Sequence, residues 1–192
     1  MAVVVVVVVV VAVVGVHSLT PAPSSASSFA DRPKTRNWPE TQVDLVVLTD
    51  GERVLGFGDL GVHGMGVCVS KIAMYTACGG LHPQRCLPIC IDVGTNNKEL
   101  LDSPFYVGYH HTRVRGEEYN ELLEETISEI HLRFGHKTFI QFEDFSFENS
   151  ARFLREYRAD APVYDDDIQG EALIPIHEAD LIRISWPTIT HD

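Results

Sequence analysis

Hydrophobic and polar positions alternate along this chain in blocks that predict strands and helices in turn. Short apolar runs that end in turn residues are typical of buried strands. Such runs predict strands at Val43–Leu48, Arg85–Asp92, 139–142 and 162–164. Helical spacing predicts helices at Val67–Cys78, Glu117–Phe134 and about 147–157. Strands that alternate with helices predict an α/β fold in which helices flank a parallel sheet.

The helix at Glu117–Phe134 has the clearest pattern of the chain. Its apolar residues recur at helical spacing and are Tyr119, Leu122, Leu123, Ile127, Ile130 and Phe134. Glutamates gather in its first half, where the helix dipole favours negative charge, and Gly135 is suited to end it. Ligands of parallel α/β sheets bind at the C-terminal ends of strands, so a site is expected where the predicted strands end.

Two acidic clusters lie directly after predicted strands. One contains Glu143 and Asp144, and the other is Asp165–Asp167. Carboxylates from neighbouring strand ends can converge, and like charges persist in a partly buried site mainly when a cation lies between them. Such oxygen ligands suit Mg²⁺ or Mn²⁺. A solvated acidic turn is the alternative, although the phenylalanines around the first cluster favour burial.

A glycine-rich segment, Gly56–Gly66, contains five glycines and predicts irregular, closely packed backbone. Its first part, Gly56–Gly61, matches the dinucleotide fingerprint G-x-G-x-x-G. The acidic residue expected about 20 positions later is not clearly present, so a tight glycine loop is favoured over a nucleotide site. Arg53 and Lys71 flank the segment. Their positions alone are typical of surface residues, but with the acids they indicate metal-assisted chemistry on a small anion.

Length and charge narrow the class of protein. The 192 residues suit one domain with a sizeable core. Fifteen Lys and Arg oppose 27 Asp and Glu, a net charge of −12, so nucleic acid and membranes are not expected partners. The four cysteines form no C-x-x-C pair, which argues against a zinc knuckle. They are expected to be reduced, mostly buried thiols of an intracellular protein.

Residues 1–36 differ in composition from the rest of the chain. Val3–Val11 is a run of nine valines, which is too short to span a bilayer. It fits either a low-complexity tract or a targeting segment. The Ser-, Pro- and Ala-rich stretch that follows is expected to be disordered, and an organelle transit peptide stays open. Residues 1–36 are therefore expected to lie outside the folded core.

Several longer strings resemble the malic enzymes. They are Leu48–Gly61, Ile91–Asn97, Asp102–Tyr106, Ile140–Phe145 and Asp166–Gly170. The resemblance implies a partial malic enzyme N-terminal catalytic domain at 37–170, with residues 171–192 as an unrelated tail. It implies oxidative decarboxylation of L-malate to pyruvate and CO₂, with reduction of NAD or NADP. The choice between these two cofactors stays open, because none of the matching residues decides it.

The resemblance also assigns roles to individual residues. The implied ligands of Mg²⁺ or Mn²⁺ are Glu143, Asp144 and Asp167. Arg53 is implied to bind a malate carboxylate, a task that suits a bidentate guanidinium. Lys71 is implied to be the general base, paired with Asp166, and needs a lowered pKa to be neutral near pH 7. In this family the glycine loop belongs to the substrate domain, which favours the tight-loop interpretation.

The match to the family is partial. Its catalytic tyrosine lies upstream of the matched region and its nucleotide-binding domain lies downstream. A Rossmann domain is therefore expected to be absent, and the isolated, truncated chain to be inactive. The alternatives are a non-catalytic metal-binding remnant, a partner of a full-length subunit, or a fragment that does not fold stably. The family's dimers and tetramers imply a homo-oligomer. A cytoplasmic location is expected, with plastid or mitochondrion as the alternative.

Overall fold

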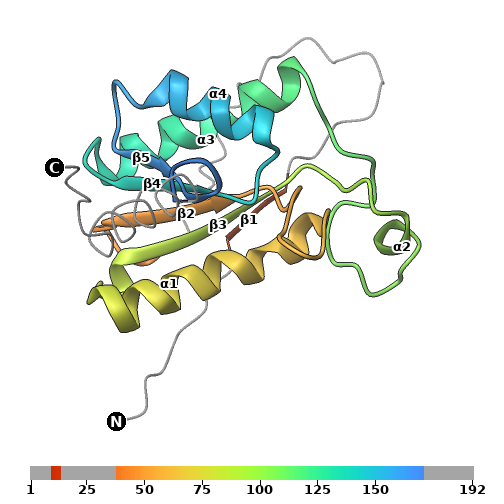
Figure 1. Ribbon diagram of the computed structural model, residues 1–192, viewed down its shortest axis with the longest axis horizontal. Coiled ribbons are helices and arrows are strands. Elements are labelled where there is room, and N and C mark those ends of the chain that lie inside the picture. The colour runs from red at the N-terminus through yellow and green to blue at the C-terminus, as the bar shows by residue number, and fades with distance from the viewer. Residues whose placement is uncertain (1–9, 14–37, 171–192) are drawn as a thin grey trace, which may run out of the picture.

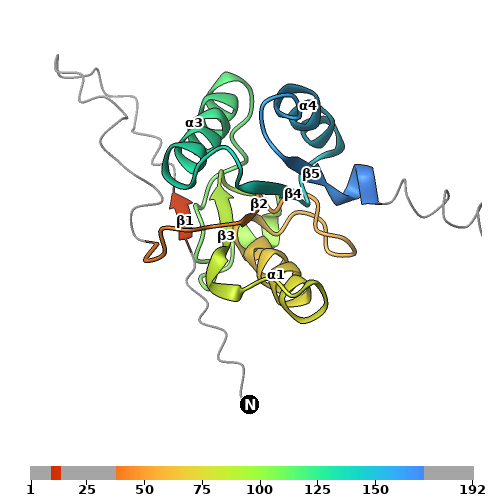
Figure 2. The ribbon, with the colours of Figure 1, turned by 90° about the vertical axis from the view of Figure 1, so that its left-hand side faces the viewer.

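The computed structural model describes residues 10–13 and 38–170, and its centre is one parallel β-sheet (Figure 1). The five strands lie in the order β1-β3-β2-β4-β5. Their bounds are β1 Val10–Val13, β2 Leu45–Thr49, β3 Cys86–Asp92, β4 Phe139–Glu143 and β5 Val163–Asp165. The helices are α1 Met65–Gly79, α2 Lys98–Leu101, α3 Glu117–Phe134 and α4 Phe147–Tyr157. Helix α1 covers one face of the sheet, and α3 and α4 cover the other (Figure 2).

The central strands are apolar because both of their faces are covered. Every residue of β2 and β3 is buried, as expected for parallel strands between helical layers. Alternate side chains of a strand point to opposite faces. Leu45 and Val47 therefore pack in the cluster under α1, whereas Val46 and Leu48 pack in the cluster under α3 and α4.

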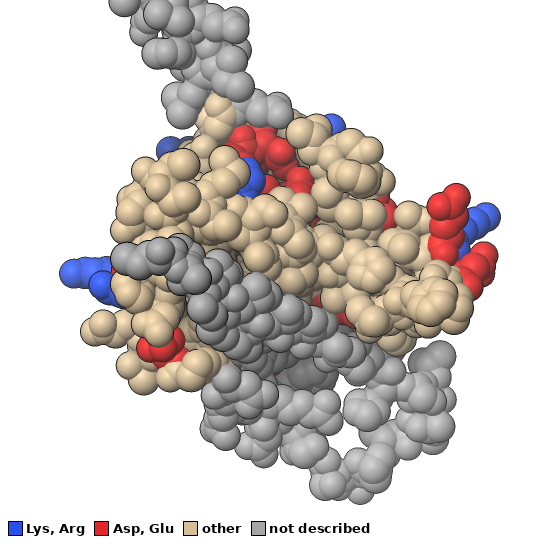
Figure 3. All heavy atoms as spheres, turned by 90° about the horizontal axis from the view of Figure 1, so that it is seen from below, with Lys and Arg blue, Asp and Glu red and all other residues tan. Residues whose placement is uncertain are grey.

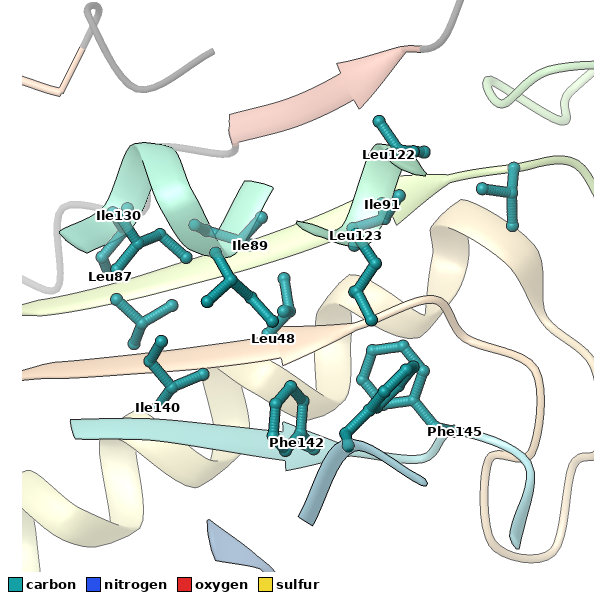
Figure 4. Packing of buried hydrophobic residues seen from close by; sticks show 14 of the residues in the cluster. Leu48, Leu87, Ile89, Ile91, Leu122, Leu123, Ile130, Ile140, Phe142 and Phe145 are labelled. Atoms are coloured by element: carbon teal, nitrogen blue, oxygen red, sulfur yellow. The ribbon is translucent and has the colours of Figure 1, made fainter. Parts of the chain in front are cut away.

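The larger core lies between the sheet and helices α3 and α4 (Figure 4). Phe142 from β4 packs against Phe153 of α4, with ring centroids 5.1 Å apart. Phe145 meets the same Phe153 ring edge to face at 5.2 Å. Ser146 begins α4 by accepting a hydrogen bond from the backbone N–H of Asn149, as an N-cap residue does. This cap places α4 directly after the acidic end of β4.

The chain leaves two adjacent strands toward opposite faces of the sheet. After β2 it crosses through α1, and after β4 it crosses through α4 on the other face. Strands β2 and β4 are hydrogen-bonded neighbours in parallel register, with Thr49 beside Glu143. Such a topological switch opens a crevice outside the C-terminal ends of the two strands, where ligands of doubly wound sheets bind. Both predicted acidic clusters lie at this edge.

Helix α1 differs from the other long helices in having a single charged residue, Lys71. The visible surface on this side of the molecule shows few charged side chains (Figure 3). All four cysteines are free thiols, and three of them are buried, as the sequence predicted. In the part of the chain that the structure describes, no helix is long and apolar enough to cross a membrane.

The predicted α/β class is confirmed, and α3 has the predicted bounds. The other predicted elements begin and end within two residues of their observed bounds. One expectation is wrong: Val10–Val13 was placed outside the core, but it pairs with β3 as an edge strand. Valine favours strands, and β3 offers an open edge for pairing. Expectations for residues 1–9, 14–36 and 171–192 fall outside the described residues.

Replacing Phe153 with alanine should destabilise the fold by about 3–5 kcal/mol, because it opens a cavity in the aromatic cluster under α4. Leu132→Ala is the matched control, since Leu132 is also helical but is 81 % exposed. That change should alter stability by no more than about 0.5 kcal/mol. Urea unfolding followed by circular dichroism measures both. Equal losses for the two variants would contradict the assignment of Phe153 to the core.

Candidate functional site

The candidate site lies in the crevice at the C-terminal ends of β2 and β4. Its centre is the ammonium of Lys71, whose Nζ lies 3.2 Å from Oε1 of Glu143. The same ammonium forms an ion pair with Oδ2 of Asp166. Lys71 comes from α1 on one face of the sheet, while Glu143 ends β4 and Asp166 follows β5. The fold thus joins three residues that are far apart in the sequence, and the implied pairing of Lys71 with Asp166 is present.

Burial and charge shift the titration of this group. Burial raises the pKa of Glu143 to about 8; the charge of Asp166 adds to this shift, while Lys71 opposes it. Burial lowers the pKa of Lys71, but its hydrogen bond to Asp166 and the charge of Glu143 raise it by more. The net pKa shift of Lys71 is upward. The described residues therefore hold the amine as an ammonium, whereas the sequence reasoning expected a lowered pKa.

Asp144 adopts a backbone conformation that is rare for its residue type. Its φ is +55°, in the left-handed region, directly after β4. Its carbonyl oxygen accepts a hydrogen bond from the backbone N–H of Arg53 at 2.9 Å. Burial raises the pKa of its carboxyl to about 6, and the charges of Asp167 and Asp166 add to this. The Oδ2 atom of Asp144 is buried and has no hydrogen-bond partner among the residues that the structure describes.

A cavity of about 450 Å³ opens beside Phe145 and Asp167, which directly follow Asp144 and Asp166 in the chain. Its lining residues are Arg53, Val54, Leu55, Gly56, Gly58, Phe145, Phe147, Ser150, Asp167 and Ile168. Arg53 is exposed and shares the cavity with Asp167. Lys71 does not line it; the lysine meets Glu143 and Asp166 instead. The predicted site residues thus form two groups, one around Lys71 and one around Arg53. Asp144 links them, because its carbonyl bonds to Arg53 and its carboxylate lies near Asp166 and Asp167.

The predicted metal ligands do not form a finished metal site. Within 10–13 and 38–170, no three Asp, Glu, His or Cys side chains are grouped so as to hold a metal ion. Glu143 gives one carboxylate oxygen to Lys71 and the other to the amide of Gln141. The donor chemistry still suits a hard divalent cation, because the unpartnered Oδ2 of Asp144 is a buried carboxylate oxygen close to further acids.

The glycine-rich segment forms a tight loop. Gly56 and Gly58 have positive φ, and Val54 pairs with Gly58 across a short antiparallel bridge. Gly51 and Gly61 touch backbone to backbone, since a Cβ atom on Gly51 would lie 2.0 Å from the carbonyl oxygen of Gly61. This geometry agrees with the predicted tight loop, which holds Arg53 at the rim of the cavity.

Sequence reasoning missed a buried arginine that fixes this loop. Arg113, whose side chain is 1 % exposed, forms a bidentate pair with Asp59 through contacts of 2.8 and 2.9 Å. Its Nη2 also donates to the carbonyl oxygen of Asp50 at 2.8 Å. Burial opposes the pKa shift of Asp59, but its bonds to Arg113 and to the Asn96 backbone lower it overall. Arg113 therefore ties both ends of the Asp50–Asp59 loop together.

Tyr119 and Glu52 secure the same loop. The Tyr119 hydroxyl donates to Oδ2 of Asp50 at 2.7 Å, and the backbone N–H of Glu52 donates to Oδ1 at 3.0 Å. Burial raises the pKa of Asp50 to about 6, although Arg113 opposes the shift. No local pattern could have predicted this network, because Arg113 and Asp59 lie 54 positions apart.

The sequence of this chain is similar to a known protein family. The family model described as malic enzyme, N-terminal domain, matches residues 24–158. The mitochondrial NADP-dependent malic enzyme of Mus musculus is 54% identical over 140 residues, which are 73% of this chain and 23% of that protein. Its Homo sapiens counterpart is 51% identical over 140 residues, with the same coverage of 73% and 23%.

One further relative and one solved structure are similar to this chain. The NADP-dependent malic enzyme of Mus musculus is 52% identical over 139 residues, 72% of this chain and 24% of that protein. A crystal structure of Entamoeba histolytica malic enzyme has a TM-score of 0.46 and 25% identity, covering 80% of this chain and 31% of that one. The chain spans about a quarter of the length of the curated relatives that it matches.

Replacing Arg113 with methionine should destabilise the fold by about 3–5 kcal/mol, because Asp50 and Asp59 lose their buried counter-ion. Arg115→Met is the matched control. Arg115 pairs with Glu52, but its side chain is 54% exposed, and exposed pairs contribute about 1 kcal/mol or less. Chemical denaturation of both variants measures the difference. If Arg115→Met cost as much as Arg113→Met, the buried pair would not be what holds the loop.

Proposed function

Because this chain belongs to the malic enzyme family, we propose that it carries the metal- and malate-binding half of an NADP-linked oxidative decarboxylation site. The reaction converts L-malate to pyruvate and CO₂. The observation that supports this most is the position of Lys71, between Glu143 and Asp166 at the topological switch of the sheet. A lysine held by strand-end carboxylates beside an arginine-lined cavity suits a small dicarboxylate.

The residues that would hold a divalent cation are Glu143, Asp144 and Asp167. Their donors are hard carboxylate oxygens, which Mg²⁺ and Mn²⁺ prefer. The buried, unpartnered Oδ2 of Asp144 supports this assignment, since such an atom is otherwise costly to bury. When bound, the cation supplies Lewis-acid stabilisation of the negative charge that develops as CO₂ leaves.

Arg53 would bind a malate carboxylate from the rim of the cavity. Its guanidinium is exposed toward the space it shares with Asp167, so a carboxylate can reach it without displacing a buried ion pair. A planar guanidinium offers two parallel N–H donors to a carboxylate, which fixes orientation as well as position. The hydrogen bond from its backbone N–H to Asp144 keeps the arginine close to the predicted cation ligands.

Lys71 would accept the proton of the malate C2 hydroxyl as hydride leaves that carbon. The amine must first lose its own proton, and the surrounding carboxylates oppose this by raising its pKa. A cation held by Glu143 would offset the charge of that carboxylate and so lower the pKa of Lys71. Asp166 would orient the amine throughout. The proposed base therefore depends on a cation being in place.

The hydride acceptor is proposed to be NADP, because the relatives described above are named as NADP-dependent enzymes. The described residues form one parallel sheet, which the candidate site already uses, so the acceptor is proposed to bind residues outside 38–170. The names of the mitochondrial relatives support a mitochondrial setting beside the cytoplasmic one.

Mn²⁺ should stabilise the 192-residue chain. At 100 times its dissociation constant, a ligand that binds only the folded state adds about 2.7 kcal/mol, and thermal melts with and without Mn²⁺ measure it. The double variant Glu143→Gln/Asp167→Asn should show no shift. Glu121→Gln/Asp160→Asn, with the same charge change at two exposed positions, should keep it. An equal shift in both double variants would rule out the site.

A chimera tests the catalytic role directly. Residues 38–170 of this chain, which include Asp166 and Asp167, replace the corresponding segment of the mouse mitochondrial NADP-dependent malic enzyme, and NADP reduction is followed with malate and Mn²⁺. Lys71→Ala in the chimera should lower kcat by about 10²–10⁴-fold, the usual contribution of a positioned base. Lys137→Ala, at an exposed position, should leave kcat unchanged. A well-folded chimera with no NADP reduction, or one indifferent to Lys71→Ala, would contradict the proposal.

A further inference from the structure

A chain of hydrogen bonds runs away from Lys71 and Glu143 along the α1 face of the sheet. The amide Nε2 of Gln141 donates to Oε2 of Glu143 at 2.7 Å. The amide oxygen of Gln141 in turn accepts a hydrogen bond from the Tyr75 hydroxyl. Gln141 is fully buried. The proposed mechanism uses neither Gln141 nor Tyr75.

The spacing of Lys71 and Tyr75 on helix α1 matches the spacing of Glu143 and Gln141 on strand β4. Gln141 and Glu143 are two apart on β4, so their side chains lie on the same face of the sheet, about 6.6 Å apart along the strand. Lys71 and Tyr75 are four apart on α1, so they share a helix face, about 6 Å apart along the axis. Lys71 therefore contacts Glu143, and Tyr75, about one helical turn farther along α1, contacts Gln141.

The orientation of the Gln141 amide follows from its two partners. A carboxylate can only accept hydrogen bonds, so the NH₂ group must face Glu143. The opposite orientation would set the amide oxygen against a carboxylate oxygen and leave a buried group unsatisfied. The Tyr75 hydroxyl then donates to the amide oxygen, so both ends of the amide are satisfied in this orientation. Glu143 thus selects the amide conformer, and Tyr75 holds it in place.

We infer that Gln141 is a positioning residue for Glu143, and that Tyr75 fixes Gln141 from the opposite side. By occupying Oε2, the amide directs Oε1 toward Lys71 and the strand end where a divalent cation would bind. This inference rests on the proposed function, because it assigns Glu143 as a cation ligand. Hydrogen bonds to metal-ligating carboxylates orient them, and their loss typically weakens metal affinity about 10–100-fold.

Tyr75 also reaches a second cavity, on the far side of Gln141 from Glu143. This hollow of about 430 Å³ is lined by Asp44, Leu45, Tyr75, Leu81, Phe139, Gln141 and Tyr164. Tyr75 and Tyr164 thus line the same space, but of their two hydroxyls only that of Tyr75 is hydrogen-bonded to the Gln141 amide. Tyr164→Phe is therefore a matched control, since it removes a hydroxyl from the same hollow without touching the hydrogen-bond chain.

The test is Mn²⁺ titration of the 192-residue chain, with free Mn²⁺ followed by electron paramagnetic resonance. Gln141→Met keeps the side-chain length but has no amide, and should raise the Mn²⁺ dissociation constant about 10–100-fold. Tyr75→Phe should raise it about 2–10-fold, as expected for one lost hydrogen bond. Tyr164→Phe should leave it unchanged. Melting temperatures measured without metal show whether each variant is folded. A higher dissociation constant in a folded variant then reports on the site itself.

The outcomes distinguish this inference from the proposed function. Wild-type binding with an unchanged constant in folded Gln141→Met overturns the positioning role and leaves the proposed function standing. If Gln141→Met does not fold, Tyr75→Phe decides, and a constant equal to that of Tyr164→Phe overturns the inference. Absence of Mn²⁺ binding by the wild-type chain overturns the proposed cation site and the inference with it. A weakened constant in Tyr75→Phe but not in Tyr164→Phe supports the hydrogen-bond chain.

Discussion

Negative charge gathered at the ends of β4 and β5 is the constraint on which this site depends. Glu143 and Asp166 contact the single ammonium of Lys71. The charges of Asp166, Asp167 and Lys71 also shift the pKa of the nearby Asp144. Unbalanced charge is costly in such a partly buried place, so the fold must deliver Lys71 there. Close glycine contacts make this possible, since a Cβ on Gly64 would lie 2.6 Å from the Cα of Gly51. Helix α1 can then start directly over the strand ends.

The molecule contains two clusters in which acids outnumber a single base. Around Arg113 both acids are fully hydrogen-bonded, because the guanidinium meets Asp59 bidentately and Asp50 beside it, and Tyr119 and the Glu52 backbone N–H also donate to Asp50. Around Lys71 the acids outnumber the base, and the pKa values of Glu143 and Asp144 are raised. The first cluster stabilises the loop and leaves no carboxylate oxygen for a ligand. Around Lys71 the buried Oδ2 of Asp144 has no hydrogen-bond partner among the described residues, and clustered acids with raised pKa values are typical of a functional site.

The strength of each sequence signal explains what could be predicted. Helix α3 has apolar residues at every expected turn, so its bounds followed from spacing alone. The strand β1 was missed because a valine run has the same composition whether it forms a strand or a low-complexity tract. The Arg113–Asp59 pair and the contact of Tyr75 with Gln141 join distant segments, and no local pattern encodes them. The roles of Arg53 and Lys71 came from the resemblance, since each residue alone is typical of a protein surface.

The left-handed backbone of Asp144 has a consequence for how this position can change during evolution. Few residues other than glycine, asparagine and aspartate tolerate a φ of +55°. Glycine relaxes the backbone but deletes the carboxylate, and asparagine keeps the shape but removes the charge. In a copy of this chain that is no longer selected for cation binding, replacement of Asp144 by glycine therefore relaxes the turn without loss of a needed carboxylate. The identity of residue 144 among related sequences thus becomes a marker that separates active lineages from those that keep only the fold.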